Sequence, residues 1–194
     1  MDLLNVTSSA RLGRVVHGLI VALAACVPAW GSARAQAPAV EYAVKATYLY
    51  KFAPFVDWPA GTFASPADPL VICVAGSDAV AALVDEAVKG QTIAAHPIDV
   101  VHLPAAPRDP RCHILYVALH GAAAARMLDS VRGTPVLTVT DAARDARTRG
   151  IVNFVVPENR VRFEIDVGAA AENHLVVSSK LLSLAIRVSP KPGF

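Results

Sequence analysis

Charged side chains are scarce in this sequence, and neither sign dominates. Lysine, arginine, aspartate and glutamate make up 18% of the 194 residues, and the formal net charge is +2. Without residues 1–35, which contain Arg11, Arg14, Arg34 and Asp2, 15 basic and 15 acidic side chains remain. A neutral domain has no general attraction for nucleic acid or anionic lipid. The composition excludes a charge-driven nucleic-acid binder, and the 54% hydrophobic content excludes a disordered chain.

Catalytic and cofactor-binding motifs are also missing. The Gly76-Ser77 turn lacks the spacing of a dinucleotide or phosphate loop, and no Gly-x-Ser-x-Gly elbow is present. A Ser/Lys pair at Ser178 and Lys180 is outweighed by the interpretation of Ser178 as a helix cap. Cys112 and His113 lack a second pair of ligands at zinc-site spacing. The sequence therefore predicts no enzyme, no metal site and no cofactor.

One long apolar run is present, close to the N-terminus. Two arginines precede an apolar stretch at 15–30, and Ala33-Arg34-Ala35 has the small-x-small pattern of a signal peptidase site. We predict a signal peptide over residues 1–35, export, and a mature chain that begins at Gln36. The alternative is lipidation of Cys26, because the Leu-Ala-Ala before it resembles a bacterial lipobox. That route would leave a lipid-anchored protein.

Beyond the signal peptide the sequence has only two cysteines, Cys73 and Cys112. Export would place them in an oxidising compartment, where disulfides persist. Cys73 stands inside the apolar run 71–75, and Cys112 stands just before the apolar run 114–117. Neighbouring strands would bring the two within bonding range. A disulfide is favoured, with two buried free thiols as the alternative.

The remaining pattern predicts one α/β domain. A short Pro/Ala tail at 36–40 is followed by a helical pattern from Glu41, which we expect to end at Trp58-Pro59. Strands are expected at 70–75, 98–103, 114–119, 136–140, 151–156 and 161–167, and helices at 79–89 capped by Asp78, at 121–131, in a short stretch after Asp141, and at 179–188 capped by Ser178. This order predicts a mixed, largely parallel sheet of about six strands, with helices on both faces and a C-terminal hairpin.

Aromatic residues are few, at 6%, but many of them gather between positions 42 and 63. The structural interpretation is core packing, because Val44, Tyr48, Phe52 and Phe55 recur at helical spacing. The functional interpretation is that some of them stay partly exposed and contact a protein or a small ligand. The residues concerned are Tyr42, Tyr50, Trp58 and Phe63, and the candidate binding residues are Lys45, Tyr48 and Trp58.

Eight segments in order carry a resemblance to a known family. They are 44–52, 55–59, 72–74, 112–116, 136–141, 150–154, 161–166 and 178–185. Together they resemble the YfiR-like family of bacterial periplasmic proteins, over about residues 41–188. Residues 189–194 are then a C-terminal tail.

The resemblance implies a periplasmic regulator rather than an enzyme. Such a protein represses an inner-membrane diguanylate cyclase by binding its periplasmic region, and so controls cyclic di-GMP and biofilm formation. The resemblance also implies a homodimer, capture by an OmpA-like outer-membrane lipoprotein, and a Cys73–Cys112 disulfide. Some members have a second cysteine pair, which is missing here between Asp141 and Phe154. The alternative is a periplasmic small-ligand-binding protein that uses a pocket beside Trp58 and Lys45.

Overall fold

Two continuous apolar runs form the middle of a sheet that is buried on both faces. The computed structural model describes residues 33–65, 67–104, 111–141 and 146–190, and the chain from Pro38 onward is one compact unit. In β2 (Leu70–Ala75), Ile72 and Val74 join the core that contains helix α1, whereas Cys73 and Ala75 join the core that contains helix α3. Parallel strands covered by helices on both sides have this composition.

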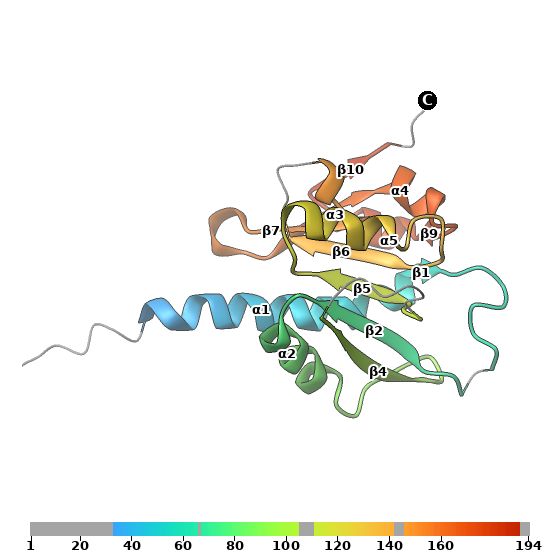
Figure 1. Cartoon of the computed structure of the whole chain (residues 1–194), viewed down its shortest axis with the longest axis horizontal. Coiled ribbons are helices and arrows are strands. Elements are labelled where there is room, and N and C mark those ends of the chain that lie inside the picture. Colours follow the sequence, from blue (N-terminus) through green and yellow to red (C-terminus); the bar gives the residue numbers. More distant parts are fainter. Residues whose placement is uncertain (1–32, 66, 105–110, 142–145, 191–194) are drawn as a thin grey trace, which may run out of the picture. The chain divides into compact units, whose positions relative to one another are not determined.

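The main sheet has eight strands in the order β10-β8-β7-β6-β5-β2-β4-β3 (Figure 1). The other strands are β3 (Thr92–Ile93), β4 (His96–Leu103), β5 (Ile114–Val117), β6 (Leu137–Asp141), β7 (Val152–Val155), β8 (Arg162–Asp166) and β10 (Arg187–Ser189). The strands from β4 to β7 run parallel, as do β8 and β10, whereas β7–β8 and β3–β4 are antiparallel. The predicted fold class and hairpin are confirmed. The strand number exceeds the expected six because the short edge strands β3 and β10 were not foreseen.

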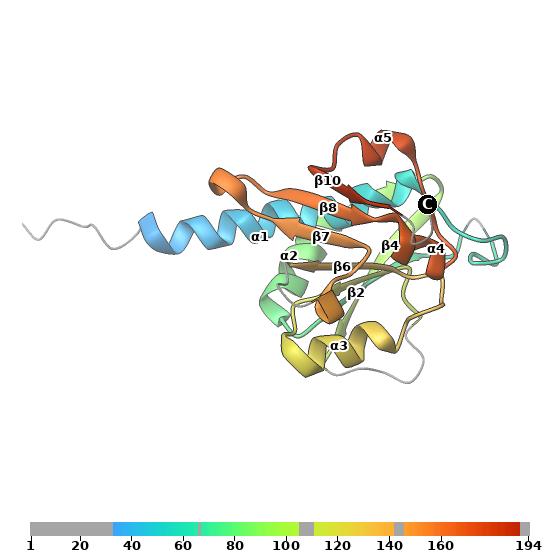
Figure 2. The same ribbon diagram turned by 90° about the horizontal axis from the view of Figure 1, so that it is seen from above.

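Helices cover both faces of this sheet. Their bounds are α1 (Ala33–Phe52), α2 (Asp78–Val88), α3 (Gly121–Asp129), α4 (Val167–Glu172) and α5 (Ser179–Leu182). Buried residues of α1 and α2 share one core, and α3 covers the opposite face (Figure 2). A separate pair of strands, β1 (Val56–Asp57) and β9 (Val176–Val177), is antiparallel. Among the described helices, none is both long and apolar enough to span a bilayer.

Helix α1 differs from the predicted helix at both ends. Residues 36–40, expected as a tail, are helical, in keeping with the alanines that surround them. The helix ends at Phe52 and not at Trp58, because Pro54 has no N–H to donate and opens the 3-10 turn Ala53–Phe55 that leads into β1. The predicted signal peptide lies outside the described residues, apart from its last three.

Two cap assignments also differ in part. Ser77, not Asp78, caps α2, because its Oγ accepts a hydrogen bond from the Val80 N–H. Ser178 caps α5 as predicted, but α5 stops at Leu182 instead of residue 188. The strand β10 then lies beside β8, as suits the β-branched Val188 at its centre.

Buried hydrogen bonds tie the parallel strands β6 and β7 to each other. The Asn153 Oδ1 accepts from the Gly150 N–H at 2.9 Å and from the Thr140 Oγ1 at 2.7 Å, and its Nδ2 donates to the Gly150 carbonyl at 2.8 Å. The Thr138 Oγ1 accepts from the Ile151 N–H at 2.9 Å. Only glycine fits at 150, since a Cβ there would lie 2.8 Å from the Thr138 carbonyl oxygen. These polar side chains fix the register of the two strands.

Candidate functional site

Lys45 of α1 is enclosed by carboxylates and aromatic rings. Its side chain is buried, and its Nζ donates to Glu41 Oε1 at 2.5 Å, one helical turn earlier. The same Nζ lies 2.8 Å from Asp141 Oδ1, at the end of β6. The rings of Tyr42 and Phe154 lie 5.0 and 5.9 Å from the ammonium. Lys45 therefore joins α1 to the sheet and is not offered to a partner at the surface.

The opposite charges in this cluster stabilise one another. Burial alone lowers the pKa of Lys45, but hydrogen bonds and charges from Asp141 and Glu41 outweigh it and raise the pKa above 10.5. The Tyr116 hydroxyl donates to Asp141 Oδ2 at 3.1 Å, and burial together with the Asp141 charge raises the pKa of Tyr116. At neutral pH the lysine is charged and the tyrosine protonated. Asp141 is the acceptor that both groups share. The short helix that Asp141 was expected to cap begins on residues 142–145, which lie outside the described residues.

Tyr48 belongs to an aromatic core. Its ring stacks on Phe52 at 5.7 Å and meets Phe163 edge-on at 5.8 Å, while Phe52 meets Phe163 at 5.2 Å. Such offset and edge-on pairs stabilise a core beyond the area they bury. Tyr48 and Phe52 therefore take part in core packing. The four residues expected to stay partly exposed are all intermediate in burial: Tyr42, Tyr50, Trp58 and Phe63.

Trp58 opens a segment that we call the aromatic loop, residues Trp58–Ser65. Its indole Nε1–H donates to the Pro135 carbonyl at 3.1 Å. Phe63 of the same loop stacks between two imidazoles, with ring centroids 4.2 Å from His96 and 4.3 Å from His113. The indole meets the Phe63 ring edge-on at 6.2 Å. Trp58 therefore stands in a cluster of its own, apart from the ring contacts of Lys45 and Tyr48.

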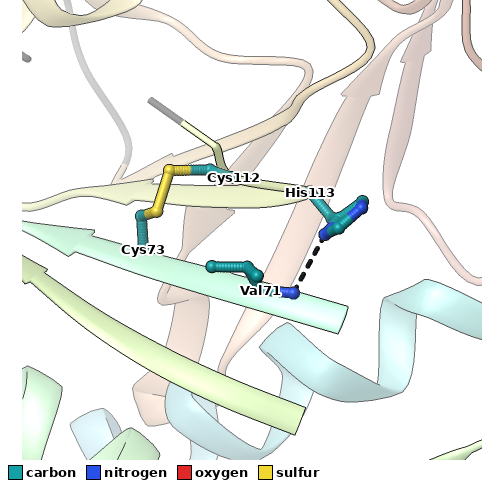
Figure 3. Close-up of a disulfide and its surroundings, with 4 residues drawn as sticks. All are labelled: Val71, Cys73, Cys112 and His113. Atoms are coloured by element: carbon teal, nitrogen blue, oxygen red, sulfur yellow. Dashed lines mark hydrogen bonds between the residues drawn. A yellow bond between two sulfur atoms is a disulfide. The ribbon is translucent and has the colours of Figure 1, made fainter. Parts of the chain in front are cut away.

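His113 continues the hydrogen bonding between β2 and β5 with its side chain (Figure 3). The His113 N–H donates to the Val71 carbonyl at 2.9 Å, and the Val71 N–H donates back to the His113 Nδ1 at 2.9 Å. Burial lowers the pKa of His113, against a smaller opposing effect of a hydrogen bond to the Thr62 backbone. The imidazole thus connects the sheet to the aromatic loop.

The disulfide lies beside this histidine. Cys73 of β2 is bonded to Cys112, just ahead of β5, with their Cα atoms 5.7 Å apart (Figure 3). Both residues are buried. The structure thus contains the expected disulfide, and the alternative of two free thiols does not apply.

A cavity of about 680 Å³ opens at the amino ends of β2, β5 and β6. Its apolar lining comes from Val71, Cys112 and Val136. One charge of each sign is added by Arg111 and Asp68. Sequence reasoning missed this cavity, because its lining comes from loops that are distant in sequence. A pocket was expected beside Trp58 and Lys45, and neither residue lines this one.

At the opposite edge of the sheet, where doubly wound sheets usually bind ligands, the end of β2 is closely packed. Gly76, at the end of β2, has φ +86°, and a Cβ on it would lie 2.5 Å from Leu119 Cδ2. Leu119 thus packs against the Gly76 backbone, and the neighbouring Ser77 hydroxyl accepts the α2 cap hydrogen bond. This agrees with an ordinary strand-to-helix turn rather than a phosphate loop.

Comparison with known families places the domain. A family model described as YfiR/HmsC-like matches residues 42–186. The chain belongs to the YfiR/HmsC-like family. The match includes the buried Lys45 cluster, the aromatic loop and the disulfide of this YfiR/HmsC-like domain. None of the curated protein sequences compared with the chain matches it.

The YfiR/HmsC-like domain brings Lys45 and Tyr48 together but not Trp58. Lys45 and Tyr48 both contact the ring of Phe154, whereas Trp58 contacts Phe63 and His113. No group of three His, Cys, Asp or Glu side chains within the described residues is arranged to hold a metal ion.

Proposed function

We propose that this YfiR/HmsC-like protein is a non-enzymatic regulator in the periplasm. It represses an inner-membrane diguanylate cyclase by binding the periplasmic region of that enzyme. The observation that carries the proposal is the extent of the family match, because residues 42–186 run from within α1 to the residue before β10. The predicted signal peptide supports the location. A homodimer and capture by an OmpA-like outer-membrane lipoprotein belong to the same proposal.

A regulator that acts by binding needs apolar surface for its partner. Four large apolar side chains of the C-terminal segment are exposed: Val176 (63%), Leu184 (61%), Ile186 (52%) and Val188 (39%). Val176 of β9 pairs with Asp57 of β1, the residue just before Trp58. The β9 strand is therefore next to the start of the partly exposed aromatic loop. We propose β9 together with this loop as the contact with the cyclase.

Deleting the chromosomal copy is expected to raise cellular cyclic di-GMP and promote biofilm, and the wild-type chain should reverse both. Val176→Asp should fail to reverse them, because a charge at an apolar contact weakens binding. Val101→Asp is the matched control, since Val101 is also exposed, at 40%, but lies on β4. Cyclic di-GMP is measured by mass spectrometry, and circular dichroism checks that both variants fold.

An unchanged cyclic di-GMP level in the deletion strain, with the candidate cyclase expressed, would contradict the repressor proposal. Full reversal by Val176→Asp would remove β9 as the contact and leave the repressor proposal intact.

A second candidate function is small-ligand binding in the cavity beside the disulfide. Its volume of about 680 Å³ suits a small organic molecule. Arg111 lines it, and its guanidinium forms no ion pair in the described part of the chain. A guanidinium above apolar walls suits an anion with an apolar body.

Benzoate is therefore expected to bind in a calorimetric titration, and neutral benzamide to bind at least about tenfold more weakly, in line with a charge-assisted hydrogen bond. Arg111→Gln should remove this difference. Equal affinities for the two probes, or no binding of either, would eliminate this candidate.

A further inference from the structure

We propose that His113 is a proton-sensitive clasp, which fastens the aromatic loop to the amino ends of β2 and β5 and releases it when the imidazole gains a second proton. The clasp is a property of the isolated domain and does not depend on the proposed function.

The clasp uses the Nδ1 of the neutral imidazole, which acts as an acceptor. Nδ1 accepts from the Val71 N–H at 2.9 Å, so the proton of the neutral ring must be on Nε2. The backbone of Thr62, in the aromatic loop, acts on the same ring and favours its protonated form. A second proton on Nδ1 would set two N–H donors against each other. The Val71 bond is then lost, and the ring must turn or move.

Movement of this ring displaces the loop, because the loop is stacked on it. The rings of Phe63 and His113 are nearly parallel, at 6° and 4.3 Å, and Thr62 precedes Phe63 in the chain. On the other side of Phe63, the His96 Nδ1 is 2.7 Å from the Asp68 carbonyl oxygen. The edge of the Trp58 indole also faces His113, at 6.4 Å. One ring therefore supports both Phe63 and Trp58.

The charged and titratable groups around His113 have opposing effects on its protonation. Asp68 favours the second proton, whereas His96 and, most strongly, burial oppose it. The Asp68 carboxylate already accepts from the N–H groups of Ala64 and Ser65. Arg111 lines the same cavity as His113 and adds positive charge.

Burial prevails among these effects, and the pKa of His113 lies below the ordinary imidazole value of 6.5. An imidazole freed from the clasp keeps the ordinary value and binds the proton more readily than the clasped one. The clasp is therefore fully stable above pH 6.5 and weakens as the pH falls through the lowered pKa.

Trp58 can report this opening. The whole chain is expressed with Trp30→Phe and purified as the cell processes it, so that Trp58 is the only tryptophan. Acrylamide quenching of its fluorescence measures solvent access, while far-UV circular dichroism monitors the fold. As the pH falls from about 8 to about 4.5, access to Trp58 should rise in one transition centred below 6.5, with the circular dichroism unchanged.

His113→Asn should lose this transition, because the amide oxygen can accept from the Val71 N–H but does not titrate. His96→Asn is the matched control and should keep it, since His96 stacks on the other face of Phe63. In the unmodified chain, nitrogen NMR of the histidines should show the Nε2–H form of His113 at neutral pH. The Val71 amide signal should shift with the same midpoint as the imidazole.

Three results would overturn the clasp: a transition that persists in His113→Asn, no change in Trp58 access while the protein stays folded, or an Nδ1–H form of His113 at neutral pH. The NMR measurement needs no variant, and so it decides the question even if His113→Asn fails to fold.

Discussion

Replacing Lys45 with methionine is expected to lower the free energy of unfolding by about 2–4 kcal/mol. Removing one partner of a buried ion pair leaves the other charge uncompensated, which costs roughly 3–5 kcal/mol when both are fully buried. Here Lys45 is buried, but the side chains of Glu41 and Asp141 are 31% exposed and can regain part of their hydration. The loss of stability should therefore be about 2–4 kcal/mol, somewhat less than for a fully buried pair. Urea unfolding followed by circular dichroism measures it.

Lys51→Met is the matched control, because Lys51 is an exposed lysine of the same helix. Its effect should stay within about 0.5 kcal/mol. Adding Asp141→Asn to Lys45→Met should recover part of the loss, because the orphaned carboxylate is then gone. If Lys45→Met were as stable as Lys51→Met, Lys45 would not hold α1 to the sheet.

The Lys45 cluster also determines how the stability of the domain changes at alkaline pH. Since the folded-state pKa of Lys45 is raised, the contribution of Lys45 is complete at neutral pH and is lost only as the pH rises through that raised value, above 10.5.

Cys73→Ser is expected to lower the free energy of unfolding by about 2–4 kcal/mol. The disulfide joins residues 39 apart, and opening a loop of this length returns chain entropy to the unfolded state. Both cysteines are buried, so the variant also leaves a serine hydroxyl and a thiol in apolar surroundings. Urea unfolding of the variant and of the wild type measures the difference.

Wild-type protein unfolded with and without a reductant provides the comparison for the bond alone. Equal stability of the oxidised wild type and Cys73→Ser would show that the bond does not stabilise this domain.

Local patterns predicted six of the eight strands of the main sheet and the start of several helices. The strand Leu70–Ala75 has the predicted bounds, because an apolar run between Pro69 and Gly76 has no other local solution. The end of α1 was wrong, because the aromatic spacing continues past Pro54 although the helix cannot. The last helix was too long, because β10 forms only through its pairing with β8, which no local pattern reveals.

For the candidate site, too, local features could be predicted from the sequence and contacts between distant residues could not. The cysteine pair was predicted because each cysteine adjoins a recognisable strand. The Lys45–Asp141 ion pair and the His113–Val71 hydrogen bond were not, because they join residues far apart in sequence. Such contacts depend on the order of the strands in the sheet. The sequence showed only the types of the two side chains, lysine and histidine, and neither type alone indicates its partner.

The hydrogen bonds around Asn153 have a consequence for how the domain responds to its surroundings. The link between β6 and β7 consists of amide and hydroxyl groups. The second cysteine pair that the family resemblance implies for some members is missing between Asp141 and Phe154. A reductant leaves amide and hydroxyl groups unchanged. In the described part of the chain, a thiol reagent can act only on the Cys73–Cys112 bond, beside the aromatic loop. A reductant would therefore act at the end of the sheet where we propose the His113 clasp, and not on the hydrogen bonds that tie β6 to β7.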